Sequence, residues 1–192
     1  VHAGDIQGDL SLKDLADYKV LVKPALCGPY KDYTVCSAPP SSSGGVAMNL
    51  ILSLYADITA KSGATTEEAK LRDFVLAQQL GYADRDHYVA DPAAVPVADL
   101  LNPAYIKSRA AAGFKPGDAP MPGDPGATLH NKPMVDMWGR DANAAQPGTT
   151  HMSFVDYEGN AVAFTATVEG PFGSSRWTNG LELAAYDNSV PR

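Results

Sequence analysis

Apolar residues recur at helical spacing over much of the first half of the chain. The run from 46 to 60 is apolar on most sides, which predicts a buried helix. Two threonines followed by two glutamates at 65–68 are typical of a helix start, and they predict a second helix that ends at about Tyr88. Shorter helices are predicted at 11–16, which has a capping pattern, and at 104–112, which follows an Asn-Pro pair. We therefore expect two long helices and two short ones.

A first hairpin is predicted from two short runs of β-branched and aromatic residues. Val20-Leu21-Val22 and Tyr33-Thr34-Val35 flank a turn at 28–32 that contains Gly and Pro. If this hairpin closes with an even-numbered loop, Cys27 and Cys36 lie directly opposite each other, at a Cβ separation that a disulfide tolerates. An odd-numbered loop would separate them, so two buried thiols and one disulfide both stay open. A bridge would favour an oxidising compartment.

A second hairpin is predicted over 149–168. A three-residue loop that ends with Gly159 in the left-handed conformation would close it and pair the residues on either side of the loop. Counting outward from that pair places Thr149 opposite Thr167. A slip of one residue would put the two hydroxyl groups on opposite faces of the hairpin.

A segment rich in proline and glycine separates the two predicted structured regions of the chain. Between residues 113 and 148, six prolines and six glycines occur with few periodic apolar positions, which predicts a mobile linker. The expected organisation is an αβ region over 1–112, the linker over 113–148 and a β-hairpin region over 149–192.

Charge, hydropathy and cysteine count exclude several classes of function. The 192 residues have a net charge of -7 and no basic run that could neutralise phosphates, so nucleic acid is not an expected partner. The longest apolar stretch, near 46–56, is well short of the ~20 residues that a membrane-spanning helix needs. Two cysteines are too few for a disulfide framework or a four-thiolate zinc site.

The strongest candidate for chemistry is a threonine at the end of the Gly/Pro-rich segment. If the Gly148–Thr149 peptide bond were cut, Thr149 would have a free α-amino group with a pKa of about 7.7–8.0, suitable for proton transfer at neutral pH. Nucleophile and base would then belong to one residue. Gly148 adds no side chain at the carbonyl that the Thr149 hydroxyl must attack. Across the hairpin, Thr167 could hydrogen-bond to the Thr149 hydroxyl or amine and fix its rotamer.

Other polar clusters have structural interpretations. The serines at 41–43 lack the Gly-x-Ser-x-Gly pattern and are expected to cap a helix and form a tight turn. The acidic residues that flank His87 fit neither an EF-hand loop nor a zinc site, and we expect Asp84 with Arg85 to make structural ion pairs. His151 is expected to be a hydrogen-bonded structural histidine, because the Thr149 amine already supplies a base.

Six short segments, spread over nearly the whole chain, form a specific pattern. They are Gly8-Asp9-Leu10-Ser11-Leu12-Lys13-Asp14-Leu15, Pro39-Pro40-Ser41-Ser42-Ser43-Gly44-Gly45, Ala83-Asp84-Arg85-Asp86-His87-Tyr88-Val89-Ala90-Asp91-Pro92, Gly148-Thr149-Thr150-His151-Met152-Ser153-Phe154-Val155-Asp156, Gly159-Asn160-Ala161-Val162 and Phe172-Gly173-Ser174. In this order they resemble the gamma-glutamyltransferase family. The last three resemble the junction between the two subunits of that family and the start of its small subunit.

The resemblance implies an Ntn-hydrolase fold of the α+β class, a four-layer αββα sandwich that is incomplete in this chain. It implies an inactive precursor that cuts itself before Thr149 into a large and a small subunit. Thr149 would be the nucleophile and new amino terminus, and Thr167 its hydrogen-bonding partner. A gamma-glutamyl group, typically from glutathione, would pass to Thr149 Oγ and then to water or an amino acid. No metal or organic cofactor is implied, and the implied location is the periplasm or the extracellular space.

Three features depart from the family pattern. Glu169 stands where the family commonly has Asn, and its carboxylate could pair with a substrate ammonium but would repel a carboxylate. Residues 183–187 replace a Leu-Asn-Asn run that helps to bind the substrate amine. The family's oxyanion-hole residues and its carboxylate-binding arginine have no counterpart in the 192 residues, so we expect a fragment or truncated relative that is unprocessed or inactive alone. A glutaryl-type acylase or amidase and a non-catalytic domain of the same fold stay open as alternatives.

Overall fold

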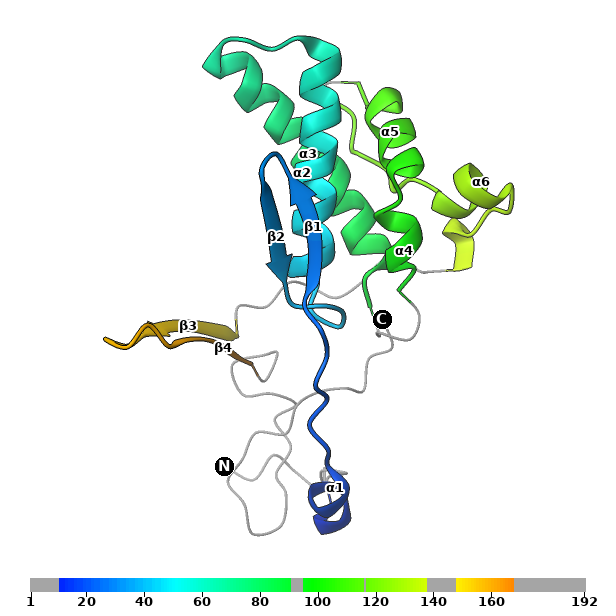
Figure 1. The fold of residues 1–192 in the computed structure, drawn as a ribbon. Helices are drawn as coiled ribbons and strands as arrows, with labels where there is room; N and C mark the ends of the chain where they lie inside the picture. The colour runs from blue at the N-terminus through cyan, green and yellow to red at the C-terminus, as the bar shows by residue number, and fades with distance from the viewer. Residues whose placement is uncertain (1–10, 91–94, 116, 138–147, 168–192) are drawn as a thin grey trace. The chain divides into compact units, whose positions relative to one another are not determined.

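The computed structural model describes residues 11–90, 95–115, 117–137 and 148–167, and its fold combines helices and strands (Figure 1). These residues belong to two units. The larger one, here called the helical unit, contains the described residues between 22 and 137. The smaller one contains helix α1 (Leu12–Asp17) and the hairpin of strands β3 (Thr149–Val155) and β4 (Ala161–Thr167). The mixed helix and strand composition that the sequence predicts is confirmed.

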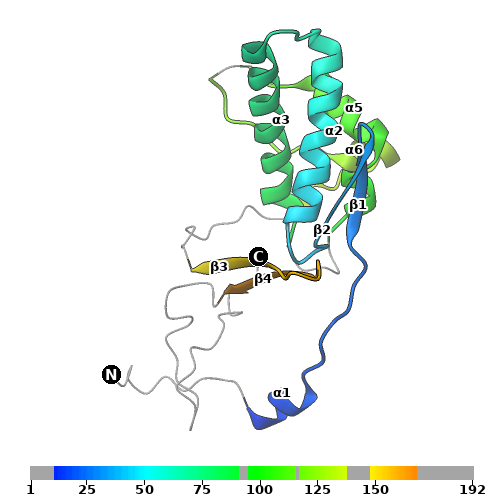
Figure 2. The same ribbon diagram turned by 60° about the vertical axis from the view of Figure 1, so that its left-hand side comes forward.

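Two long helices form the centre of the helical unit. Helices α2 (Gly44–Ser62) and α3 (Glu67–Tyr88) pack side by side (Figure 2). Together with α5 (Pro103–Ala112) they enclose an apolar core in which Leu50 and Leu54 are fully buried. All three helices lie where the sequence predicts them, because apolar residues three and four positions apart form one face that must be buried.

The helix ends follow the capping chemistry of the sequence. At the start of α3, the Thr66 hydroxyl accepts a hydrogen bond from the Ala69 backbone N–H. At the end of α2, Gly63 adopts a left-handed conformation with φ 66°, which glycine reaches without steric cost. In α1, Ser11 and Asp14 form the reciprocal capping box that the sequence predicts.

A short hairpin lies beside α2. Strands β1 (Leu26–Tyr30) and β2 (Tyr33–Ser37) pair antiparallel around a two-residue turn. Because this turn has an even number of residues, Cys27 and Cys36 are directly opposite each other, and they form a disulfide. The bridge joins the two strands covalently.

The first strand begins later than the sequence predicts. Residues 20–22, expected to form a strand, lie outside the strands, whereas Gly28 and Pro29, expected in the turn, belong to β1. Packing explains the difference: a Cβ atom at Gly28 would lie 2.2 Å from Asn49 Oδ1 of α2. Glycine therefore permits the close approach of β1 to the helix and has no role in the turn.

A buried ion pair joins α3 to α5. Asp84 is fully buried, and Arg109 Nη2 lies 3.0 Å from its Oδ1 atom. Arg85, which the sequence pairs with Asp84, instead pairs with Asp86 on the surface. Asp84 therefore makes a structural ion pair, as expected, but its partner is Arg109 and not Arg85, because Asp84 is fully buried between α3 and α5 whereas the Arg85 side chain lies at the surface.

Part of the segment predicted to be a mobile linker is folded. Helix α6 (Pro125–His130) and the 3-10 helix η1 (Val135–Met137) lie within it, and the Pro125 side chain is fully buried. Tyr88 of α3 donates its hydroxyl hydrogen bond to the Gly123 carbonyl at 2.6 Å. Local composition does not reveal such contacts between distant residues. A short helix, α4 (Val97–Leu100), also forms without a sequence prediction.

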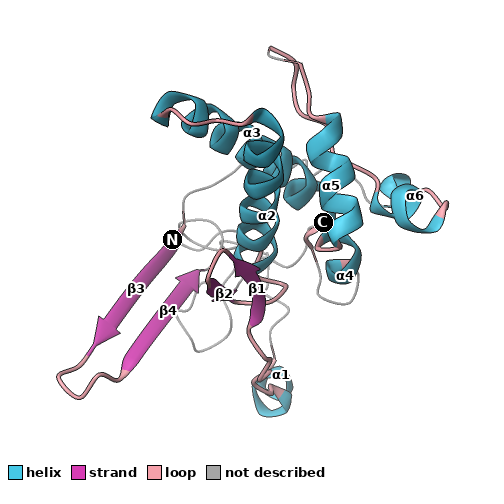
Figure 3. Cartoon of the chain, turned by 45° about the horizontal axis from the view of Figure 1, so that its top comes forward, coloured by secondary structure: helices cyan, strands magenta, loops and turns pink. Residues whose placement is uncertain are grey.

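The β3–β4 hairpin has the predicted register. Figure 3 shows β3 and β4 as two antiparallel arrows joined by a loop. Thr149 is opposite Thr167, and Gly159 in the loop has a φ of 86°, in the left-handed region. Alternation along β3 places Thr149 and His151 on one face of the hairpin and Phe154 on the other. No helix in the described part of the chain is long and apolar enough to cross a membrane.

Candidate active site

The candidate nucleophile is the first residue of β3. Gly148 directly precedes the strand, and Thr149 begins it opposite Thr167, the last residue of β4. The strand begins here because two consecutive β-branched residues, Thr149 and Thr150, follow the glycine. This end of the hairpin therefore brings both threonine side chains to the same face.

The two threonines form a short chain of hydrogen bonds that ends on the Gly148 carbonyl. Thr149 Oγ1 donates to Thr167 Oγ1 at 3.0 Å, and Thr167 Oγ1 donates to the Gly148 carbonyl oxygen at 3.4 Å. Thr167 therefore contacts both the hydroxyl and the carbonyl that a cleavage before Thr149 requires. A donor on this oxygen favours the negative charge that develops there when the carbonyl carbon is attacked. The sequence does not reveal the contact with Gly148.

His151 lies on the same face, one alternation further along β3. Its Nδ1 atom is 2.6 Å from Thr165 Oγ1, and its Nε2 atom is 3.2 Å from Ser153 Oγ. Both ring nitrogens thus have hydroxyl partners within the hairpin, as the sequence predicts for a structural histidine.

The loop of the hairpin is held by one carboxylate. The Asn160 side-chain amide donates to Asp156 Oδ2, and the backbone N–H groups of Asn160 and Glu158 donate to Oδ1. These hydrogen bonds, that of the Asn160 side chain first, hold the pKa of Asp156 below its usual value. Because the loop sets the register, this turn determines that Thr149 and Thr167 meet.

Other residues singled out in the sequence do not join this group. Glu169 and Asp91 lie outside the described residues. Ser43 occupies the N-cap position of α2, but its hydroxyl accepts a hydrogen bond from Arg85 Nη2 at 3.0 Å and does not cap the helix. The capping prediction for this serine is therefore wrong, because its backbone has a helical conformation (φ -81°, ψ -16°) and not the extended one that a side-chain N-cap needs.

Metal ligation has no support among the described residues. In this part of the chain, no group of three or more His, Cys, Asp or Glu side chains could hold a metal ion. His87 has a structural partner, because its Nε2 atom lies 2.6 Å from the Val135 carbonyl oxygen.

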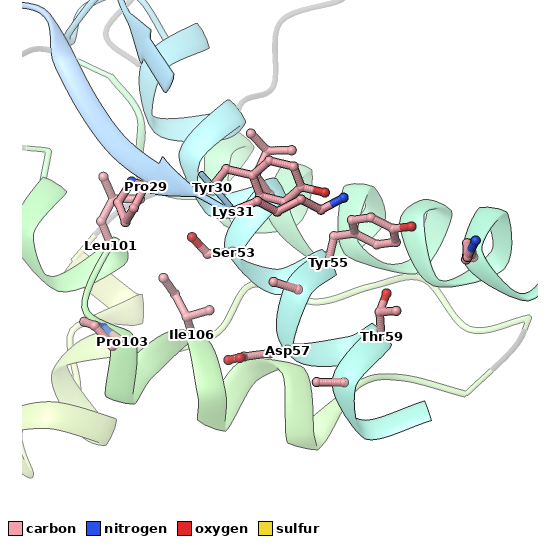
Figure 4. A pocket seen from close by; sticks show the side chains of 14 residues that line it. Pro29, Tyr30, Lys31, Ser53, Tyr55, Asp57, Thr59, Leu101, Pro103 and Ile106 are labelled. Atoms are coloured by element: carbon pink, nitrogen blue, oxygen red, sulfur yellow. The ribbon is translucent and has the colours of Figure 1, made fainter. Parts of the chain in front are cut away.

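The helical unit has a cavity that the sequence does not predict. It has a volume of 590 Å³ and lies over one face of α2, between the tip of the β1–β2 hairpin and the start of α5 (Figure 4). Tyr30 and Tyr55 line it with their rings, and Asp57 and Ile106 lie at its other side. None of its lining residues belongs to the β3–β4 hairpin.

Comparison with known proteins first defines a class, that of enzymes made as proenzymes. The chain is 34% identical over 170 residues to the glutathione hydrolase proenzyme of Escherichia coli (strain K12), which covers 87% of this chain and 27% of that protein. It is 29% identical over 183 residues to the acylase ACY 1 proenzyme of Pseudomonas sp. (strain V22), with coverages of 93% and 29%. The crystal structure of Helicobacter pylori gamma-glutamyltranspeptidase is similar with a TM-score of 0.52 and 29% identity, over 60% of this chain and 35% of that one.

The family is identified by a match over almost the whole chain. The sequence pattern of the gamma-glutamyltranspeptidase family matches residues 2–183. The chain therefore belongs to the gamma-glutamyltranspeptidase family, and the resemblance seen in the sequence motifs is confirmed. It spans about 30% of the length of the curated relatives that it matches.

Proposed function

We propose that this chain carries the self-processing site of a gamma-glutamyltranspeptidase, and that Thr149 becomes the catalytic nucleophile once the Gly148–Thr149 bond is cut. One observation carries the proposal: the hydrogen bonds from Thr149 Oγ1 to Thr167 Oγ1 and from there to the Gly148 carbonyl. Membership of the family supports it, because relatives of this chain bear the name proenzyme.

Processing would begin with attack of Thr149 Oγ1 on the carbonyl carbon of Gly148. The C–N bond then breaks, the hydroxyl proton passes to the departing nitrogen, and an ester joins the Gly148 acyl group to Thr149 Oγ1. Water hydrolyses this ester, which leaves a carboxylate on Gly148 and a free amine on Thr149. Thr167 favours the first step by donating to the carbonyl oxygen.

Turnover would use the same hydroxyl with a new base. The free Thr149 amine, with a pKa of about 7.7–8.0, accepts the Oγ1 proton while Oγ1 attacks the side-chain carbonyl of a gamma-glutamyl amide. The amine of the donor leaves, and the gamma-glutamyl group stays on Thr149 as an ester. Water or an amino acid then takes this group. We propose glutathione-type amides as donors, in line with the glutathione hydrolase name of the relatives.

The assembly and location follow from the same proposal. Cleavage would give a piece ending at Gly148 and a piece beginning at Thr149, which belong to the large and small subunits of one precursor with an αββα sandwich. We place the protein in the periplasm or the extracellular space. The Cys27–Cys36 disulfide supports this location, because structural disulfides persist in oxidising compartments.

A second candidate is an acylase that removes a glutaryl-type group by the same threonine chemistry. The similarity to an acylase proenzyme favours it. Glu169 and residues 183–187, where the sequence departs from the family pattern, are the positions at which donor choice would differ.

The two candidates are separated by a pair of chromogenic donors. Gamma-glutamyl-p-nitroanilide and glutaryl-p-nitroanilide differ by the α-amino group, so the ratio of their hydrolysis rates reports which acyl group the site accepts. In a complete proenzyme that contains these 192 residues, we expect the wild-type sequence to release nitroaniline faster from the gamma-glutamyl donor, and Thr149→Ala to release none above background. Equal release above background by wild type and Thr149→Ala would contradict the catalytic role of Thr149. Release at background by both would favour a non-catalytic domain.

A further inference from the structure

We infer that the cavity over α2 is a binding site for a short peptide with free termini. The ammonium group of the peptide pairs with Asp57, and its carboxylate pairs with Lys31. The side chain of its last residue lies against the rings of Tyr30 and Tyr55. All four residues belong to the helical unit, and none belongs to the β3–β4 hairpin. The inference therefore goes beyond the proposed processing at Thr149, and its test does not depend on that step.

Asp57 is a partly buried carboxylate without a partner. It takes part in no hydrogen bond or ion pair within the described part of the chain. The other carboxylates in this part that are at least partly buried all have partners, namely Asp73, Asp84, Asp99 and Asp124. A carboxylate that is partly removed from water without a partner loses hydration that nothing replaces. A cation in the cavity would offset this loss, so Asp57 favours a ligand with an ammonium group.

A positive charge lies at the opposite side of the cavity (Figure 4). Lys31 is at the tip of the β1–β2 hairpin, with its Nζ atom 5.4 Å from the centre of the Tyr30 ring. It is exposed and forms no ion pair with any described carboxylate, Asp57 included. The other lysine of the lining, Lys70, is already paired with Glu67. A ligand that satisfies both unpaired groups must therefore carry two opposite charges that are separated from each other.

The surface between the two charges suits a peptide. The rings of Tyr30 and Tyr55 lie on the side of Lys31, so they would cover an aromatic or apolar side chain next to the peptide's carboxylate (Figure 4). Thr59 lies one turn after Tyr55 on α2, and its hydroxyl oxygen is buried without a hydrogen-bond partner among the described residues. Such an oxygen is costly, and a peptide group offers it both a donor and an acceptor.

The walls of the cavity are held by contacts that lie outside it. The Cys27–Cys36 disulfide joins the strands of the hairpin, and the Tyr55 ring packs edge-on against Phe74 at 5.5 Å. On the other side, Ile106 is part of the buried core. The volume of 590 Å³ is in the usual range of small-ligand sites, about 300–1,000 Å³. The site is therefore formed before the ligand binds.

The test is a calorimetric titration of the full chain with glycyl-phenylalanine and two derivatives. N-acetyl-glycyl-phenylalanine lacks the ammonium charge, and glycyl-phenylalanine amide lacks the carboxylate. The variants are Asp57→Asn and Lys31→Gln, and neither side chain has a hydrogen bond or ion pair in the described chain whose loss would unfold it. The matched controls are Asp118→Asn and Lys107→Gln, which remove the same charges at exposed positions that do not line the cavity.

We expect the free dipeptide to bind wild type and both controls equally. It should bind about 10-fold more weakly to Asp57→Asn, because a hydrogen bond between charged groups is lost at a partly buried site. The loss in Lys31→Gln should be about 3-fold, since this lysine is exposed. Asp57→Asn should not weaken the N-acetyl peptide further, and Lys31→Gln should not weaken the amide further.

Three results would overturn the inference. The first is the absence of binding to wild type at millimolar peptide. The second is an equal affinity of wild type for all three peptides, because the two charges would then have no role in recognition. The third is a loss in Asp118→Asn as large as that in Asp57→Asn, because binding would then follow the net charge of the chain and not the cavity.

Discussion

At the scale of single residues, Thr167 is the side chain on which the candidate site depends most. It accepts a hydrogen bond from the Thr149 hydroxyl and donates one to the Gly148 carbonyl oxygen. One hydroxyl thus orients the attacking group and polarises the group that is attacked. Thr167 is therefore the position at which the site can be weakened while the nucleophile itself is unchanged.

Thr167→Val should slow self-cleavage about 10-fold. Valine keeps the β-branched shape but removes the hydroxyl, and one net hydrogen bond of about 1–1.5 kcal/mol corresponds to roughly a factor of ten in rate. Thr167→Ser keeps the hydroxyl and is the control, expected close to wild type. A time course of intact masses measures both rates. Identical time courses for the valine and serine variants would show that the hydroxyl has no part in cleavage.

The turn at Asp156 should weaken in acid. Hydrogen bonds from the Asn160 side chain, and next from backbone N–H groups, lower the pKa of Asp156 in the folded hairpin. A lowered folded pKa gives stabilisation that is present above the unfolded value of about 3.9 and is lost as the pH falls through the folded value. The amide resonances of Glu158 and Asn160 should therefore titrate below pH 4, and those of Asp156→Asn should not. Titration of the wild-type amides above that pH would contradict this description of the turn.

At the scale of elements, the sequence predicts the helices and strands that depend on residues close to one another in the chain. Helices α2 and α3 follow from apolar spacing and capping residues, and the β3–β4 register follows from a loop in which Gly159 adopts a positive φ. The facing of Thr149 and Thr167 is predictable for the same reason.

Elements that depend on distant contacts are not predictable in this way. Gly123, in the folded part of the segment before α6, is hydrogen-bonded to Asp84 and Tyr88, which lie 35 or more residues earlier in the chain. Gly28 suggests a turn, although a glycine is needed there because Asn49 of α2 leaves no room for a Cβ atom. The contact of Thr167 with the Gly148 carbonyl is not predictable from the sequence either, because it depends on the backbone geometry at the end of the strand.

The Cys27–Cys36 bridge should stabilise the helical unit measurably. The bridge closes a loop with a sequence separation of 9, and chain-entropy estimates for such a loop give about 2–3 kcal/mol. We expect the double variant Cys27→Ala, Cys36→Ala to lose that amount of unfolding free energy in urea titrations. Dithiothreitol should lower the midpoint of wild type towards that of the double variant and leave the variant unchanged. Two results together would contradict the bridge: a wild-type midpoint that is insensitive to the reductant, and two cysteine thiols that react with a labelling reagent before reduction.

At the scale of the whole molecule, the chain divides into two units, and the candidate cleavage site lies in the smaller one. The helical unit contains a buried apolar core, and the β3–β4 hairpin contains Thr149 with its hydrogen-bonding partner. The chain spans about 30% of the length of its curated relatives, so the activity that we propose belongs to the family's complete proenzyme architecture. An experiment on this chain alone can test the processing step that creates the nucleophile.

That step is tested most directly by intact-mass spectrometry under denaturing conditions, after incubation at neutral pH, with Thr149→Ala alongside. We expect two masses for wild type, corresponding to residues 1–148 and 149–192, and one uncut mass for Thr149→Ala. A single uncut mass from folded wild-type protein would contradict self-processing. A cut of equal extent in Thr149→Ala would show that the threonine hydroxyl does not perform it.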